Sequence, residues 1–369
     1  MKLSNGFIDM VAMRKVVPGI CFCTGVFFLA YLTSLLISEG LSSNAKSPIP
    51  PVMFSVLIGI LLRNMIKLDL SLEEGISFSV SYVLRLGIIL LGIRIGLGDV
   101  IEYGALAVPL IVICIITALF FIRMAKLRFQ ISTEMSYLIA IGTSICGASA
   151  IIALAPVINA KKAEISYAVA NIVLWGLFGM FLYPFIAKAL FAENHSATGL
   201  FLGTAIHDTA QVAASGLIYE QYFSNAKVLE IATITKLVRN TFLLLLIPAF
   251  GYIYARGKGA GSYSLKKIFP TFVLGFIFMV ILRTAGDWLA SQDLLFSNQS
   301  QWQYLVTLLK TGSGICLGVA MAALGLSTRL VELRTIGYRP FFVGFGAALL
   351  IALVSYWTIS LYIKLQLLG

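Results

Sequence analysis

The sequence is poor in charged residues and lacks the motifs of soluble enzymes. Only 12% of its 369 residues are charged, whereas 59% are hydrophobic. Roughly a quarter of a typical soluble protein is charged, so this composition excludes a soluble globular domain. No P-loop, G-x-S-x-G or HExxH pattern occurs, so nothing indicates an ATPase or a membrane hydrolase, and we expect no enzymatic activity.

Cysteine and histidine are also scarce. The five cysteines all fall in apolar stretches, which argues against a disulfide framework. There are only two histidines, and the cysteines do not have metal-ligand spacing, so we expect neither a metal site nor a cofactor. The net charge of +11 is spread over loops and a few intramembrane positions rather than gathered in a basic arm, so we expect no nucleic-acid partner.

Long apolar runs predict an all-α polytopic membrane protein, a single transmembrane domain over residues 1–369 with the lipid bilayer around it. Each run has about the length needed to cross a bilayer. Two runs are weaker, because the second is short and the seventh contains His207, Asp208 and Gln211, so either could be re-entrant. The eleven predicted spans cover residues 16–38, 49–64, 76–98, 104–123, 134–158, 164–190, 197–218, 227–254, 268–290, 302–327 and 341–366.

The basic residues predict the orientation. With the N-terminus in the cytoplasm, sixteen of the 27 Lys and Arg residues lie in inner loops, five in outer loops and six inside spans. This asymmetry agrees with the positive-inside rule. It gives no information on the oligomeric state.

Two glycine-rich segments share the pattern G-x-S/G-I-C and lie 170 residues apart: GTSICGASA at 142–150 and GSGICLGVA at 312–320. Glycine-interrupted spans in matching places point to the binding site of a secondary transporter. We expect the chain to unwind at 142–144 and at 312–314, and each restarted helix to offer free amides to an oxyanion. The alternative is that small residues only let two helices cross closely.

A second internal match suggests an inverted repeat. SYVLRLGIILL at 81–91 resembles TKLVRNTFLLL at 235–245, which places Arg85 opposite Arg239. Five helices per copy is an odd number, so the second copy enters from the opposite side. We therefore expect two inverted five-helix repeats at about 16–158 and 164–327, with broken crossing helices and one extra helix at about 341–366.

Cations inside the spans indicate the sign of the ligand. A charged side chain at the bilayer centre costs about 2.5–3.5 kcal/mol on insertion scales, so it usually faces a partner or a cavity. We expect Arg94 and Arg283 to snorkel to the headgroups, and Arg85, Arg239 and Lys310 to have buried roles. Because acids inside the spans are few, the substrate is expected to be an anion.

The segment GTAIHDTAQVAASG at 203–216 is the other concentration of polar residues. As a helix it would place His207 and Gln211 on one face, with Asp208 beside them. A His–Asp pair in the membrane could couple transport to protons. It could equally be a structural pair that holds its helix against Lys236 and Arg239.

Several of these segments together resemble the YeiH family of bacterial inner-membrane proteins, described as sulfate exporters. The resemblance rests on PPVMFSVLIGILLRN, GTSICGASAI, GTAIHDTAQVAASG and ATITKLVRNTFLLLLIP, which occur in this order. Such proteins look distantly similar to the bile-acid/sodium symporters. The resemblance implies an inner-membrane location, crossover segments at 142–147 and 312–318, and a cavity faced by His207, Asp208, Lys236 and Arg239. No cluster of residues reads as a sodium site, which argues against sodium coupling. Proton coupling and plain exchange stay open, and the sequence does not identify the coupling ion.

The sequence therefore predicts a secondary transporter, an exporter or exchanger of a small anion such as sulfate or an organosulfonate. Alternating access would occur around a midplane site at the two broken helices. The alternative is a non-transporting membrane sensor or assembly scaffold with the same fold. The candidate substrate-binding residues are Gly142, Thr143, Ser144, Gly147, Gly312, Ser313, Gly314, Lys310, Arg85, Arg239 and Lys236, and the candidate coupling or cavity-lining residues are His207, Asp208, Gln211 and Asn240.

Overall fold

The computed structural model describes residues 10–41, 49–258, 271–292, 299–329, 331 and 338–365, and these form helices and turns without a strand. The all-α class is therefore confirmed for this part of the chain. Eight of its helices are long and apolar enough to cross a membrane. The loop cations Lys2, Lys46, Lys266, Lys267 and Arg334 lie outside the described residues.

Each of the eleven predicted spans overlaps helical residues, but three of them contain no helix that is long and apolar enough to cross a membrane. The second is α2 (Pro51–Met65), of 15 residues. The fifth is divided into α6 (Thr133–Ser144) and α7 (Ala148–Leu154), and the seventh into α9 (His195–Ala205) and α10 (Thr209–Phe223). The number of crossings and the inverted repeat therefore stay predictions.

The chain divides into two compact units, and the divisions fall inside two helices. Unit 1 comprises Met1–Ile88 and Thr311–Leu330, and unit 2 comprises Ile89–Lys310 and Val331–Gly369. The boundaries thus lie within α4 (Leu84–Leu91) and α15 (Gln299–Ser327).

In unit 1 helices pack closely where they carry glycine. Here α1 (Met10–Leu41) packs against α2 and α3 (Leu70–Phe78), and η1 (Ser79–Val83) continues α3 toward α4. Helices α2 and α15 approach backbone to backbone at Gly59 and Gly325. A Cβ on Gly325 would lie 2.3 Å from the carbonyl oxygen of Val56.

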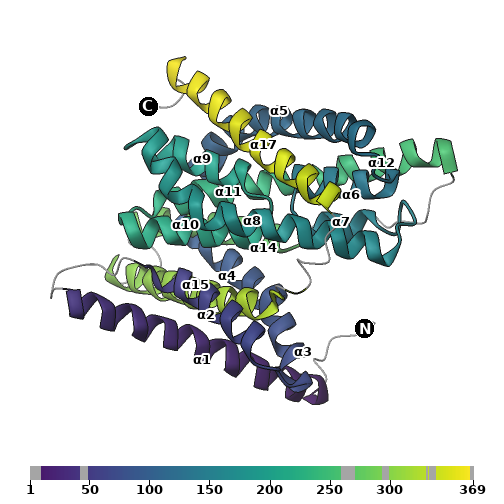
Figure 1. The fold of residues 1–369 in the computed structure, drawn as a ribbon. Coiled ribbons are helices and arrows are strands. Elements are labelled where there is room, and N and C mark those ends of the chain that lie inside the picture. The colour runs from purple at the N-terminus through teal and green to yellow at the C-terminus, as the bar shows by residue number, and fades with distance from the viewer. Residues whose placement is uncertain are drawn as a thin grey trace. The chain divides into compact units, whose positions relative to one another are not determined.

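Unit 2 is built around α11 (Lys227–Thr241), which contacts α5, α9, α10 and α12. Eleven of its fifteen residues are buried, including polar and charged ones. The C-terminal helix α17, yellow in Figure 1, packs against α5, α8 and α9. The other unit 2 helices are η2 (Gly92–Arg94), α5 (Leu97–Phe129), α8 (Lys162–Phe191), α12 (Leu243–Lys258), α14 (Phe272–Ser291) and α17 (Tyr338–Lys364).

The predicted break at residues 312–314 is wrong, because α15 is continuous through them. Glycine costs a helix only about 0.8–1.0 kcal/mol relative to alanine, a cost that packing can offset. The hydroxyl of Ser313 donates to the carbonyl of Gly87 at 2.8 Å, and a Cβ on Gly87 would lie 2.9 Å from the Leu317 side chain. The small residues of this segment thus allow close crossing of α4 and α15. This agrees with the alternative, given above, that they serve helix packing.

The glycine crossing in unit 1 can be tested with two substitutions in one helix. We expect Gly325→Ala to lower the free energy of unfolding by about 1–3 kcal/mol, because the added methyl group overpacks a backbone contact. Gly314→Ala is the matched control, since no atom of a neighbouring element lies within 4 Å of its Cβ position. Thermal unfolding of the purified protein in detergent should show a lower Tm for the first variant only. Equal Tm values would contradict the close approach of α2 and α15.

Candidate functional site

The first helix break lies where the sequence predicts one, shifted by a few residues. Gly142, Thr143 and Ser144 are still helical, α6 ends at Ser144, and α7 begins at Ala148. Gly147 closes the break with φ +65°, a conformation that favours glycine. A Cβ there would also lie 2.9 Å from Oδ2 of Asp208. Gly147 therefore allows a carboxylate from another segment to approach this break.

The second break lies between α9 and α10, not in α15. Helix α9 ends at Ala205, and α10 begins at Thr209. The carboxylate of Asp208 accepts a hydrogen bond from the amide of Ala210 at 2.8 Å, so it is the N-cap of α10. The predicted shared helix face of His207 and Gln211 is wrong, because His207 lies in the break before the helix starts.

The two breaks share a local sequence and a local geometry. Gly-Thr-x-Ile occurs at 142–145 and again at 203–206. The hydroxyls of Thr143 and Thr204 donate to the carbonyl four residues earlier, both at 2.7 Å, and approach the carbonyl three residues earlier at 3.2 Å. The two copies of Gly-Thr-x-Ile lie 61 residues apart, and they identify 203–206 as the segment that pairs with 142–145. The comparison based on G-x-S/G-I-C does not find this pairing.

Lys236, on α11, joins the two breaks. Its ammonium group donates to the carbonyl of Ile145 at 2.7 Å, in the first break. It donates to the carbonyl of Ile206 at 3.0 Å and to that of His207, both in the second break. An ammonium has three N–H donors, so these three carbonyls use all of them. The side chain is fully buried.

Arg239 lies one turn further along α11 and makes the same kind of connection. Its Nε donates to the carbonyl of Ser144 at 2.7 Å, and Nη2 donates to that of Thr143. Its Nη1 donates to the carbonyl of Thr204 at 2.6 Å and lies 3.5 Å from that of Ile206. This guanidinium is also fully buried. The planar fork of an arginine thus holds the last carbonyls of α6 and α9 together.

Electrostatics explain why cations occupy this position. The C-terminal end of a helix carries the equivalent of about −0.5 charge, and α6 and α9 both end here. Two cations facing two such ends are stabilised without acidic side chains beside each of them. With His207 neutral, the ionisable groups are Lys236, Arg239 and Asp208, with a net charge of +1. We call this assembly of the two breaks with Lys236 and Arg239 the crossing.

Several buried polar groups in or beside the crossing have no hydrogen-bond partner among the residues that the structure describes. A buried polar group without a partner costs about 1–3 kcal/mol, so such groups are rare unless they serve a purpose. The unpartnered atoms are Oγ of Ser144, Nδ1 of His207, Oε1 of Gln211, Oγ1 of Thr235 and Oδ1 of Asn240. Two further contacts fix the amides, since Gln211 donates to Val173 at 3.1 Å and Asn240 to Thr209 at 3.2 Å.

Arg94 and Arg283 are both paired with acids, and their predicted snorkelling to the headgroups stays a prediction. Arg94 binds Glu220 through 2.8 and 2.9 Å contacts, and Arg283 binds Asp287 at 2.6 Å. Lys310 is only partly buried, and its charged neighbours are these two arginines, Asp287 and Glu230. Unit 2 therefore has more acids near its cations than the sequence analysis predicts. Lys310 is part of this ion cluster and does not lie beside a helix break.

The remaining predicted site residues lie in unit 1. Gly312, Ser313 and Gly314 are helical, and the Ser313 hydroxyl is bonded to Gly87. The predicted buried role of Arg85 is wrong, because its side chain is exposed and its guanidinium lies 5.7 Å from the centre of the Tyr82 ring. Its predicted equivalent Arg239 is buried.

Among the residues that the structure describes, no group of three or more His, Cys, Asp or Glu side chains is placed to hold a metal ion. The thiol of Cys146 lies in the first break, where the hydroxyl of Ser149 approaches its sulfur at 3.2 Å. The crossing offers hydroxyl, imidazole and amide groups together with an excess positive charge. Groups of these kinds can form hydrogen bonds with a small polar ligand.

Comparisons with known proteins agree on a membrane family. Residues 18–344 match the family model described as Conserved hypothetical protein 698. The UPF0324 membrane protein FN0533 of Fusobacterium nucleatum is 34% identical over 312 residues, 84% of this chain and 88% of the relative. A UPF0324 membrane protein of Streptococcus mutans is 32% identical over 312 residues, covering 82% and 87% of the two chains. A UPF0324 membrane protein of Clostridium tetani is 30% identical over 362 residues, covering 94% and 97%.

The structural role of Arg239 can be tested by substitution, and its predicted equivalent, Arg85, provides the control variant. We expect Arg239→Met to lower the free energy of unfolding by about 3 kcal/mol or more, because the Ser144 and Thr204 carbonyls lose a buried donor. Arg85→Met removes the same charge from an exposed position and should change stability by less than about 1 kcal/mol. The measurement is thermal unfolding of both purified variants. A Tm for Arg239→Met equal to that of Arg85→Met would rule out the assigned role.

Proposed function

This chain belongs to the family described as Conserved hypothetical protein 698, and from that membership together with the crossing we propose that it is a secondary transporter of a small anion. The proposed substrate is sulfate or an organosulfonate, moved by export or exchange. Transport needs no cofactor and no covalent chemistry. The relatives are named only as membrane proteins, so their names give no substrate.

The observation that carries the proposal is the meeting of two interrupted helices around buried charge. Unwound backbone at membrane depth is tolerated only where it is buried in protein or lines a cavity. Transporters place their binding sites at such discontinuous helices. Here one ammonium group contacts both breaks, at the carbonyls of Ile145 and Ile206, so the breaks are adjacent.

The sign of the charge favours an anion. The crossing carries a net charge of +1, and the same electrostatic field that stabilises the ends of α6 and α9 attracts a negative ligand. Because Lys236 has all three donors on carbonyls, we propose that it attracts the anion without binding it directly. The choice of an oxyanion of sulfur rests on the resemblance to the sulfate-exporter family.

The unpartnered groups supply the direct contacts. The hydroxyls of Ser144 and Thr235 each have a proton to donate to an oxyanion. The amide oxygens of Gln211 and Asn240 are acceptors only, so they suit a coupling cation or a protonated group. His207 has a free ring nitrogen for a proton. Proton and sodium coupling both fit this set of groups.

Alternating access requires that ligand reach groups that are buried. Ser144 and Thr235 are fully buried, so packed helices must move apart for a ligand to enter. The two compact units provide two bodies for such a movement, and α4 and α15 each contribute residues to both. We propose a location in the bacterial inner membrane with the N-terminus in the cytoplasm, from the bias of basic residues in the loops.

The alternative is a sensor or assembly scaffold that does not transport. Lys236 and Arg239 alone fit that alternative, because they satisfy backbone carbonyls. The unpartnered hydroxyls do not fit it, since a scaffold would be more stable with alanine or valine at those positions. Buried polar groups that cost stability are expected where a ligand uses them.

Two conservative substitutions separate transport from folding. We expect Ser144→Ala and Thr235→Val to keep or raise the Tm, because each removes a buried group without a partner. Each should reduce anion flux at least about tenfold, because a hydrogen bond to a charged ligand contributes about 1.5–3 kcal/mol. Flux is measured as uptake of radiolabelled sulfate, taurine and other sulfonates into proteoliposomes, with imposed proton and sodium gradients.

The control is Thr241→Val, on the same helix but exposed, which should leave flux unchanged. Wild-type flux in both Ser144→Ala and Thr235→Val would refute the proposed site. Absence of flux in the wild-type protein for all these anions would favour the scaffold alternative.

A further inference from the structure

Unit 1 contains a pocket that the proposed transport site does not use. It has a volume of about 260 Å³ and is lined by residues of α2, α3, η1 and the end of α15. The polar or charged lining residues are Arg63, Glu73, Ser77, Ser81, Ser327 and Arg329. Pockets for drug-sized ligands occupy about 300–1,000 Å³, so this one suits a small group.

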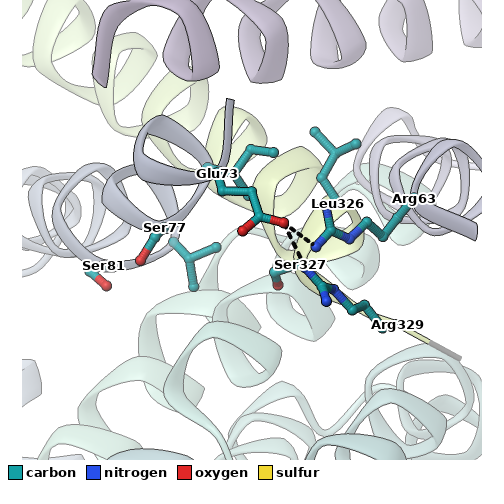
Figure 2. Close-up of a pocket in the computed structure, with 9 residues that line it drawn as sticks. Arg63, Glu73, Ser77, Ser81, Leu326, Ser327 and Arg329 are labelled. Atoms are coloured by element: carbon teal, nitrogen blue, oxygen red, sulfur yellow. Dashed lines mark hydrogen bonds and ion pairs between the residues drawn. The ribbon is translucent and has the colours of Figure 1, made fainter. Parts of the chain in front are cut away.

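Two arginines in the pocket share a single acid. Arg63, in the last turn of α2, contacts Oε1 of Glu73 at 2.8 Å, and Arg329, just after α15, contacts the same oxygen at 2.6 Å. Figure 2 shows both guanidinium groups converging on this carboxylate. Among the residues that line the pocket, two positive charges therefore face one negative charge. Two guanidinium groups converging on one carboxylate oxygen form an arrangement that suits an oxyanion.

Three hydroxyl groups also line the pocket: Ser327 lies beside the arginines, and Ser77 and Ser81 lie further along it (Figure 2). Glu73, Ser77 and Ser81 recur every four residues, so one face of α3 and η1 lines the pocket (Figure 2). Arginine binds phosphate oxygens through paired N–H donors, and serine hydroxyls add further donors. The carboxylate of Glu73 occupies the place that an oxyanion would take between the two guanidinium groups.

The surroundings of the pocket identify the source of that oxyanion. Arg63 and Arg329 lie at the ends of helices, which is where membrane helices meet the headgroup region. Large apolar side chains on the same elements are exposed beside them: Leu61 at 57%, Met65 at 74%, Ile66 at 54% and Leu70 at 78%. Acyl chains can lie along such a surface while the headgroup enters the pocket. Basic pockets between membrane helices bind anionic headgroups in this way.

We propose that the Arg63–Glu73–Arg329 pocket binds a phosphate group, that of an anionic phospholipid, which displaces Glu73 from the two arginines. Glu73 holds the guanidinium groups in place when the lipid is absent and competes with the lipid for them. Removal of its charge therefore strengthens binding. A merely structural ion network predicts no such gain.

The test is the lipid dependence of the Tm of the full-length protein in a non-ionic detergent. Dihexanoyl phosphatidic acid, dihexanoyl phosphatidylcholine and inorganic phosphate are titrated separately. We expect phosphatidic acid to raise the Tm by mass action and phosphatidylcholine, whose choline balances the phosphate charge, to have little effect. A rise with inorganic phosphate as well identifies a general phosphate site, and a rise with phosphatidic acid alone identifies a lipid site.

Variants assign the response to these residues. R63Q/R329Q should raise the half-saturating concentration of phosphatidic acid by about tenfold or more, because hydrogen bonds between charged groups are lost. E73Q should lower the half-saturating concentration. R128Q removes a charge from the exposed end of α5 in unit 2 and should respond as the wild type does. If R63Q/R329Q does not fold, R329Q alone serves, since its side chain is 46% exposed.

Two outcomes would overturn the proposal: a wild-type Tm that responds to neither phosphate probe, or a wild-type response in R63Q/R329Q. The pocket is independent of the transport site. Ser144→Ala and Thr235→Val should leave the lipid response intact, so failure of one proposal does not imply failure of the other.

Discussion

Six backbone carbonyls at two interrupted helices accept hydrogen bonds from two cations on α11, and the arrangement of unit 2 depends on this interaction. The carbonyls belong to Thr143, Ser144, Ile145, Thr204, Ile206 and His207. No water in a bilayer core can satisfy such groups, so an interrupted helix needs donors from the protein itself. Two neutral side chains one turn apart on a helix cannot supply seven N–H donors. Lysine and arginine can, and together they satisfy carbonyls that the two breaks leave without intrahelical partners.

The same interaction changes what intramembrane cations indicate. An unpaired cation in a span suggests an anionic ligand, and a cation paired with an acid suggests a structural role. Lys236 and Arg239 fit neither description, because their partners are dipolar helix ends that carry no formal charge. The positive charge is therefore stabilised but not neutralised. In the transporter that we propose, structure and ligand attraction arise from the same two side chains, and the hydroxyls of Ser144 and Thr235 supply the specificity for a ligand.

Hydropathy predicts the helical class and the approximate position of the eight helices that are long enough to cross a membrane, because the bilayer imposes a similar length and polarity on each. The glycine pattern fails for α15, where glycine and serine allow close crossing and the helix does not unwind. The segments 142–150 and 312–320 have similar compositions, so the neighbouring helix decides whether the chain unwinds. Ser313 contacts the carbonyl of Gly87 in a continuous helix, whereas the carbonyl of Ser144 accepts from Arg239 at a break. The pairing of 142–147 with 206–208 could be predicted from the shared Gly-Thr-x-Ile. The pairing of Arg94 with Glu220 could not, because the two residues are 126 positions apart.

The order of synthesis follows from the position of α11 in the chain. Ser144 and Arg239 are separated by 95 residues, so the first break is made long before its donor. At about 5–20 residues per second, the carbonyls of this break wait roughly 5–20 s for the guanidinium group. During that interval α6 and α7 cannot be placed stably in lipid as they stand in the finished protein. The insertion machinery must either hold this segment in a hydrated environment or accept it first as an unbroken helix that opens when α11 arrives.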